Sequence, residues 1–221
     1  MADQFTDMTE SMNEVMSLGG DVQKLRAYYQ DWAKTYDDDV ASHGYGLPSM
    51  MVHTVEAALT ALAGEDGRID RSVKVLDAGC GTGLVGAALC DAGFDDLHGI
   101  DLSAEMAGQA ARRGVYVTVE NGVDLSTDPP VRLQQSADIV TVGGVFTVGH
   151  VPPSALAAVA KLPVSGGLLV ISTRAAYVEQ TNFCEVLEGL IDDGVLRLLV
   201  REIDAPYTMD SNGDYWAFKV N

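Results

Sequence analysis

The chain has 221 residues, 47% of them hydrophobic, which is enough for one large domain with a substantial core. Its 32 acidic and 14 basic side chains give a net charge of −18, so its surface repels the phosphates of nucleic acids and anionic membranes. No apolar run approaches the ~18 residues of a membrane-spanning helix, and the three cysteines include no CxxC pair. We therefore expect a cytoplasmic protein that holds no metal and binds neither nucleic acid nor membranes.

The N-terminal region, residues 1–20, is polar and rich in methionine, and we expect it to be a disordered tail. It has no basic segment of the kind that opens a secretory signal. Residues 21–221 are expected to form a single domain.

Asp21 is a suitable N-cap for the first helix of this domain. An aromatic stripe follows at three- and four-residue spacing: Tyr28, Tyr29, Trp32 and Tyr36. The acidic run at 37–39 is expected to end this helix. Pro48 suits the first turn of the next helix, at about 48–63. Together these helices, residues 21–63, are expected to form a lid.

Further along the chain, short apolar runs alternate with helical patterns. The expected strands lie at 73–79, 97–101, 115–121, 138–144 and 168–173. Such alternation is typical of a parallel sheet with helices on both faces. Two further alternating runs, 195–203 and 216–220, predict an antiparallel C-terminal hairpin. The sequence therefore predicts a Rossmann-like α/β fold with a seven-stranded, mostly parallel sheet.

The first strand leads directly into a glycine-rich turn, VLDAGCGTGLVG, at residues 75–86. Gly79, Gly81 and Gly83 allow a tight turn and a close approach of a ligand to the backbone. In a parallel sheet, ligands bind beyond the carboxyl ends of the strands. Asp101, at the end of the second strand, could there accept both hydroxyls of a ribose. These residues predict a site for a cofactor that contains a nucleoside.

The expected cofactor depends on Asp77, which precedes the glycines. A carboxylate at the mouth of the turn would repel a pyrophosphate but not a cationic amino-acid group. S-adenosylmethionine has an ammonium group, a sulfonium and a ribose but no phosphate, so it is the expected cofactor. The pattern GxGxxG also matches dinucleotide sites, so an NAD(P)-dependent oxidoreductase is an alternative. A non-catalytic cofactor-binding protein that acts through a partner is another.

The motif VLDAGCGTG, with its acid, resembles motif I of the class I S-adenosylmethionine-dependent methyltransferases, and GIDLS resembles their second motif. NGVDL resembles the loop after the third strand in that class. YYQDWAKTYDDDV, GYGLP, GGVFTVGHVPPSAL and APY are similar to segments of the Williams–Beuren-region methyltransferase-like family. The resemblance covers roughly residues 25–221 and implies methyl transfer from S-adenosylmethionine.

The resemblance also implies which residues hold the cofactor. Asp77 and the glycines would hold its amino-acid half, Asp101 the ribose and Asp124 the adenine. Tyr29 and Tyr36 would wall the methionine end, and core packing is the other interpretation of both. The implied cofactor-binding residues are Tyr29, Tyr36, Asp77, Gly79, Cys80, Gly81, Gly83, Asp101, Leu102, Asp124, Leu125 and Gly143.

His150 follows the fourth strand and is the candidate catalytic base, because imidazole takes up a proton near neutral pH. A structural role in shaping its loop is the alternative. Arg174 could hold a substrate carboxylate, and a surface salt bridge is the other interpretation, which the sequence favours. The candidate substrate-binding residues are Phe146, Thr147, Arg174 and Tyr207. The expected function is methyl transfer to an oxygen, nitrogen or sulfur nucleophile of a small molecule. The sequence has no signal for which atom is methylated or for the oligomeric state.

Overall fold

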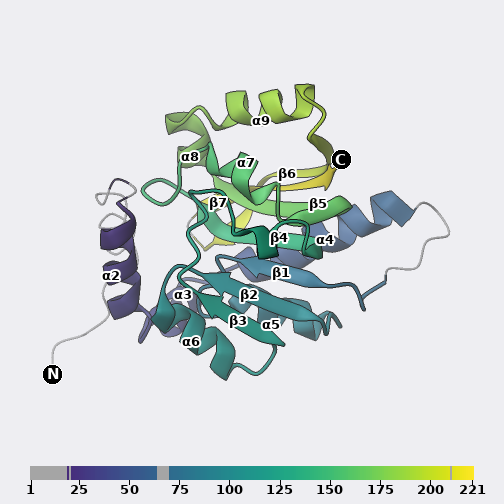
Figure 1. Ribbon diagram of the computed structural model, residues 1–221. Helices are drawn as coiled ribbons and strands as arrows, with labels where there is room; N and C mark the ends of the chain where they lie inside the picture. The colour runs from purple at the N-terminus through teal and green to yellow at the C-terminus, as the bar shows by residue number, and fades with distance from the viewer. Residues whose placement is uncertain (1–18, 20, 64–69, 210) are drawn as a thin grey trace, which may run out of the picture.

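The structure is a computed structural model that describes residue 19 and residues 21–63, 70–209 and 211–221. The disordered tail expected at 1–20 lies outside these residues, apart from Gly19. Seven strands form one sheet in the order β3-β2-β1-β4-β5-β7-β6 (Figure 1). The strands are β1 (Val75–Ala78), β2 (Leu97–Asp101), β3 (Thr118–Asn121), β4 (Ala137–Phe146), β5 (Pro163–Arg174), β6 (Leu196–Thr208) and β7 (Ser211–Val220).

Strands β1 to β5 are parallel to one another, and β7 pairs antiparallel with both β5 and β6. The four residues of β1 are all buried, as expected for a central strand that is covered on both faces. This topology confirms the predicted Rossmann-like fold class and its antiparallel C-terminal hairpin.

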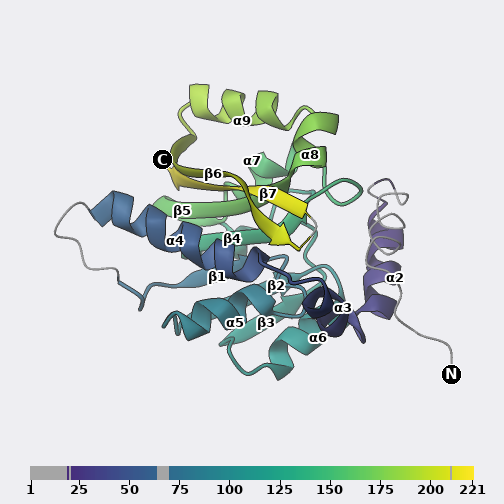
Figure 2. The same ribbon diagram turned by 180° about the vertical axis from the view of Figure 1, so that it is seen from behind.

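Helices cover both faces of the sheet. Figure 1 shows α7 in front of the sheet, and Figure 2 shows α4 crossing the opposite face. None of the described helices is long and apolar enough to cross a membrane. The helices are α2 (Val22–Trp32), α3 (Tyr36–Ser42), α4 (Leu47–Ala63), α5 (Leu84–Asp91), α6 (Ala104–Arg112), α7 (Ala155–Val159), α8 (Ala175–Gln180) and α9 (Phe183–Asp192), with a 3₁₀ turn at Val131–Leu133.

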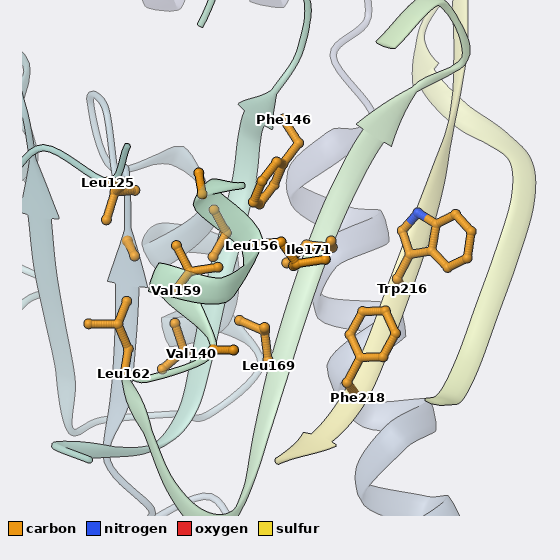
Figure 3. Close-up of a cluster of buried hydrophobic side chains, with 14 of the residues drawn as sticks. Leu125, Val140, Phe146, Leu156, Val159, Leu162, Leu169, Ile171, Trp216 and Phe218 are labelled. Atoms are coloured by element: carbon orange, nitrogen blue, oxygen red, sulfur yellow. The ribbon is translucent and has the colours of Figure 1, made fainter. Parts of the chain in front are cut away.

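The core consists of two apolar layers, one on each face of the sheet. In the first, Leu156 of α7 lies with Ile171 and Trp216 of the sheet (Figure 3), and Phe183 of α9 belongs to the same cluster. In the second, side chains of α4 and α5 such as Met51 pack against the opposite face. Burial of these side chains supplies most of the driving force for folding, at roughly 25 cal/mol per Å² of apolar surface.

The N-terminal helices differ from the prediction in two ways. The acidic run at 37–39 does not end a helix but forms the first turn of α3, where carboxylates are favoured by the helix dipole. Helix α4, which was expected to be part of the lid, is instead packed on β6, β7 and α5 as a layer of the domain. The predicted N-cap is confirmed: Asp21 accepts hydrogen bonds from the backbone N–H groups of Gln23 and Lys24.

Candidate functional site

A pocket opens at the carboxyl ends of β1, β2 and β4, and it encloses about 830 Å³ including its mouth. Helices α2 and α3 contribute part of its wall, and Figure 1 shows α2 beside this edge of the sheet. His150 lines the pocket. The predicted cofactor-binding residues that also line it are Tyr29, Tyr36, Gly79, Gly81, Asp101, Leu102, Asp124, Leu125 and Gly143.

The turn after β1 is open to the pocket at Gly81. Its φ of 56° lies in the left-handed region that glycine adopts without strain, and a Cβ placed there would meet no atom within 4 Å. Gly79 lines the pocket too, but a Cβ on it would lie 2.4 Å from the Val145 side chain. The packing of Val145, rather than a ligand, therefore requires a glycine at this position. Gly81 is therefore the position where a ligand could approach the backbone.

Asp101 ends β2 and anchors the turn. Its Oδ2 accepts a hydrogen bond of 2.8 Å from the Gly81 N–H, and its Oδ1 accepts one of 2.8 Å from the Ser103 N–H. Burial raises the pKa of this carboxyl, while the two N–H groups act in the opposite direction. Each oxygen still has a lone pair, so the carboxylate can accept further hydrogen bonds from a ligand in the pocket.

An apolar slot lies next to Asp101. It is formed by Leu102, Met106, Val123 and Leu125, and the polar residue on its rim is Asp124. The Asp124 Oδ1 accepts hydrogen bonds from the backbone N–H and the hydroxyl of Ser126, and these fix the carboxylate. Apolar lining residues together with a carboxylate acceptor fit an adenine ring with its exocyclic amine.

The charges in the pocket have one sign. Among the described residues that line it, the charged side chains are Asp101 and Asp124, and none is a lysine or arginine. A pyrophosphate in this pocket would lie close to two carboxylates without a cation to compensate them. The lining therefore fits a nucleoside cofactor without phosphate and with a positive charge.

Asp77 lies elsewhere than the sequence predicts. Its carboxylate is 1% exposed and does not line the pocket, because it points into the interior beneath the turn. There it accepts hydrogen bonds from the Tyr116 hydroxyl at 2.7 Å and from the Thr141 hydroxyl at 2.9 Å. The prediction that Asp77 stands at the mouth of the turn and excludes a pyrophosphate is therefore wrong. Asp77 supports the turn from below.

Substitution of Asp77 by Asn tests this burial. Burial raises the pKa of Asp77 to about 6, against hydrogen bonds from Tyr116 and Thr141 that lower it. An acid with a raised pKa contributes stability at low pH that is lost as pH rises through about 6. Asp77→Asn stays neutral, so its stability relative to wild type should increase by a few kcal/mol from pH 4 to pH 7, at roughly 1.4 kcal/mol per pKa unit. Urea unfolding of both proteins across this range measures the difference, and a difference independent of pH would contradict the assignment.

Tyr29 and His150 close the pocket from opposite sides. The Tyr29 hydroxyl of α2 is hydrogen-bonded to Nε2 of His150, in the loop after β4. Burial lowers the pKa of His150 to about 4, and the positive charge of Arg174 acts in the same direction. The imidazole is therefore neutral at pH 7, and with this lowered pKa it is a weaker base than the near-neutral imidazole that the sequence predicts.

A link between α3 and the glycine turn is absent from the sequence prediction. Asp37 accepts a hydrogen bond of 2.5 Å from the Thr82 hydroxyl and forms an ion pair with Arg113. Arg113 also donates to the Thr82 carbonyl oxygen. Through these contacts Asp37 holds α3 against the turn. No local pattern identifies this contact, because its partners are far apart in the chain.

Several predicted site residues lie outside the pocket. Cys80 is buried under the turn, where burial raises the pKa of its thiol, and Gly83 faces Tyr116 and Arg113. Phe146 packs in the core against Tyr177 and Phe183, so the prediction that it lines a substrate pocket is wrong. The residues of the main pocket that the prediction omitted include Val22, Leu25, Tyr45 and Met106.

The remaining predicted substrate residues lie near the pocket but do not line it. Tyr207 is buried, with its ring against Tyr45. Thr147 and Arg174 line a second hollow at the same edge of the sheet. Among the residues that the structure describes, no group of three or more histidine, cysteine or acidic side chains is placed to hold a metal ion.

Comparisons with known proteins agree with this geometry. Residues 75–167 match the family model of a methyltransferase domain. Human methyltransferase-like protein 27 is 34% identical over 170 residues, which cover 77% of this chain and 65% of the relative. The chain thus spans just under two thirds of the length of this relative.

Solved structures share the fold. A TehB-like SAM-dependent methyltransferase from Corynebacterium glutamicum has a TM-score of 0.60 and 22% identity, over 88% of this chain and 99% of that one. The magnesium protoporphyrin IX methyltransferase of Synechocystis, solved with bound SAH, has a TM-score of 0.62 and 16% identity, over 91% and 100% of the two chains. The chain therefore shares the fold of these solved methyltransferases, its residues 75–167 are similar to a methyltransferase domain, and 170 of its residues are similar to methyltransferase-like protein 27.

Proposed function

We propose that this protein is a methyltransferase that transfers the methyl group of S-adenosylmethionine to a nucleophilic atom of a small molecule. The observation that carries the proposal is the pocket whose charged lining residues are Asp101 and Asp124, at the end of a glycine turn within a methyltransferase domain. The cofactor of this class supplies an activated methyl group on a sulfonium.

The residues of the pocket fit the parts of this cofactor. Asp101 would accept the ribose hydroxyls, and Asp124 would accept the adenine amine above the slot that Leu102 and Leu125 form. Gly81 would let the amino-acid half approach the backbone. Tyr29 and Tyr36 would cover the other side of the pocket and exclude water from it.

His150 is the proposed catalytic base. It is neutral at pH 7 and lines the pocket, so its Nε2 could take a proton from an acceptor hydroxyl or amine as the nucleophile attacks. In the structure that nitrogen is hydrogen-bonded to Tyr29, so the acceptor would replace the tyrosine hydroxyl. Loss of the hydrogen bond between Tyr29 and His150 would then indicate that the acceptor is bound.

A small acceptor is favoured over a nucleic acid. The net charge of −18 repels polyanions, and the pocket is roofed by α2 and α3, which leaves little room for a macromolecule. The three cysteines are free, as in a protein of a reducing cytoplasm, which is the proposed location.

The two alternatives are less well supported. An oxidoreductase would need to hold a dinucleotide pyrophosphate beside Asp101 and Asp124, and the pocket has no basic lining residue among those described. A non-catalytic cofactor-binding protein would not need a titratable side chain in the pocket, whereas His150 lines it.

The test is formation of S-adenosylhomocysteine from S-adenosylmethionine in the presence of a panel of small hydroxyl, amine and thiol acceptors. We expect turnover with at least one chemical class, and we expect His150→Gln to lower kcat about 100-fold or more while cofactor affinity stays within a few fold. Absence of turnover across the panel, with the cofactor bound, would favour the non-catalytic alternative. Unchanged kcat in His150→Gln would remove the base assignment.

A further inference from the structure

A second hollow lies at the same edge of the sheet as the main pocket. It is formed by the loop after β4, the end of β5 and the hairpin of β6 and β7, and we name it the β5-edge cleft. Its polar lining residues are Thr147, Arg174, Asp204, Ser211 and Asn212.

Arg174 is a cation without an acidic partner. It is the last residue of β5, and among the described residues no carboxylate lies within ion-pair distance of its guanidinium. The guanidinium carbon lies 5.3 Å from the centre of the Tyr207 ring, which holds it in place. In a chain with 32 acidic residues, a half-buried arginine that faces a hollow without pairing to any of them is available to a ligand.

Thr147 supplies a second, independent sign of a ligand. The residue is 3% exposed, it lines the cleft, and its hydroxyl has no hydrogen-bond partner in the described structure. A buried hydroxyl without a partner is unfavourable, because it has lost its hydrogen bonds to water and gained none in the fold. A ligand oxygen in the cleft would give it a partner.

The cleft lies next to the proposed base. His150 follows Thr147 by three residues, and its backbone N–H donates to the Thr147 carbonyl oxygen. Burial raises the pKa of Tyr207 and lowers the pKa of His150, and the positive charge of Arg174 acts on both groups toward a lower pKa. A molecule held at Arg174 would thus have its other end close to His150.

We propose that the β5-edge cleft is the acceptor subsite and that it binds the carboxylate of a small carboxylic acid, through the guanidinium of Arg174 and the hydroxyl of Thr147. A guanidinium presents two parallel N–H donors to a planar carboxylate, and the hydroxyl can donate a third hydrogen bond. Asp204 also lines the cleft, where its Oδ1 accepts a hydrogen bond from the Asn212 amide.

This inference rests on the proposed function, but its test does not need methyl transfer. The probes are para-fluorobenzoate, its neutral match para-fluorobenzamide, and para-fluorophenyl phosphate, each titrated with the full chain and followed by fluorine NMR. We expect the benzoate to bind at least about 10-fold more tightly than the amide, since a charge-assisted hydrogen bond of this kind is worth roughly that factor or more.

Four variants assign the binding. Arg174→Gln should weaken benzoate binding about 10-fold or more, and Arg174→Lys should retain part of it. Arg197→Gln is the matched control, because Arg197 is an exposed cation of β6 that lies outside the cleft, and it should leave binding unchanged. Thr147→Val should weaken binding several-fold while the fold is no less stable, because the valine removes an unpaired hydroxyl at constant volume.

The outcomes separate the inference from the function. Equal affinity for benzoate and benzamide, or equal losses in Arg174→Gln and Arg197→Gln, would overturn the subsite. Tighter Arg174-dependent binding of the phosphate than of the benzoate would overturn the carboxylate class. If the benzoate binds as expected and no acceptor is methylated, the subsite stands and the proposed function fails.

Discussion

Asp101→Ala is expected to abolish cofactor binding at micromolar concentrations. The carboxylate would lose its hydrogen bonds to both ribose hydroxyls, and each bond to a charged group is worth about 1.5–3 kcal/mol, so the affinity should fall about 100-fold or more. The same substitution frees the N–H groups of Gly81 and Ser103, which Asp101 holds at 2.8 Å. The turn would therefore lose its support on the ligand side. Calorimetric titration with S-adenosylmethionine measures the affinity.

Two variants control for charge and for the fold. Asp95→Ala removes an exposed carboxylate of the loop before β2 and should leave the affinity unchanged. Asp101→Asn keeps the size of the side chain and one oxygen acceptor, so its affinity should lie between those of wild type and Asp101→Ala. Wild-type affinity in Asp101→Ala would show that the ribose does not bind at the end of β2.

Gly86→Ala is expected to be strongly destabilising. A Cβ on Gly86 would lie 2.1 Å from the Tyr116 hydroxyl oxygen and 2.2 Å from the ring carbon that carries it. Tyr116 cannot easily move away, because Gly83 and Gly99 also border its ring and its hydroxyl bonds to Asp77. We expect a loss of about 3 kcal/mol, from overpacking and from an uncompensated Asp77, or a Tm lower by about 6–12 °C.

Gly108→Ala is the matched control. Gly108 is also a helical glycine, in α6, and its nearest contact to an added Cβ is at 3.6 Å. Alanine should be neutral or stabilise the helix there by about 0.5–1 kcal/mol. The double substitution Gly86→Ala with Tyr116→Leu should cost less than the sum of its two single substitutions, since the collision is removed. Additive effects in that cycle would show that Tyr116 does not occupy the space beside Gly86.

The sequence predicts well the features that depend on interactions between residues close together in the chain. Buried strands appear as short apolar runs, and caps such as Asp21 and Ser103 need only the backbone of the next turn. Asp101 and Gly81 are also predictable, because the ends of parallel strands meet at one edge of the sheet whatever the side chains are.

The features that it misses depend on contacts between distant segments. Asp77 faces inward because two hydroxyl groups lie beneath it. Tyr116 comes from the segment before β3, and Thr141 comes from β4. Gly86 matches the cofactor pattern GxGxxG, yet it is required by the ring of Tyr116 rather than by a ligand. The acidic run of α3 resembles a helix breaker in the sequence. In the structure Trp32 donates a hydrogen bond of 2.8 Å to Asp39, and this contact packs α3 against α2.

The most direct test of the account is calorimetric titration of the purified chain with S-adenosylmethionine, S-adenosylhomocysteine and NADH. A pocket with two carboxylates and no basic side chain among its described lining residues predicts binding of the first two and none of NADH. Binding of NADH without either sulfur compound would mean that the glycine turn holds a pyrophosphate, and it would contradict the methyltransferase account.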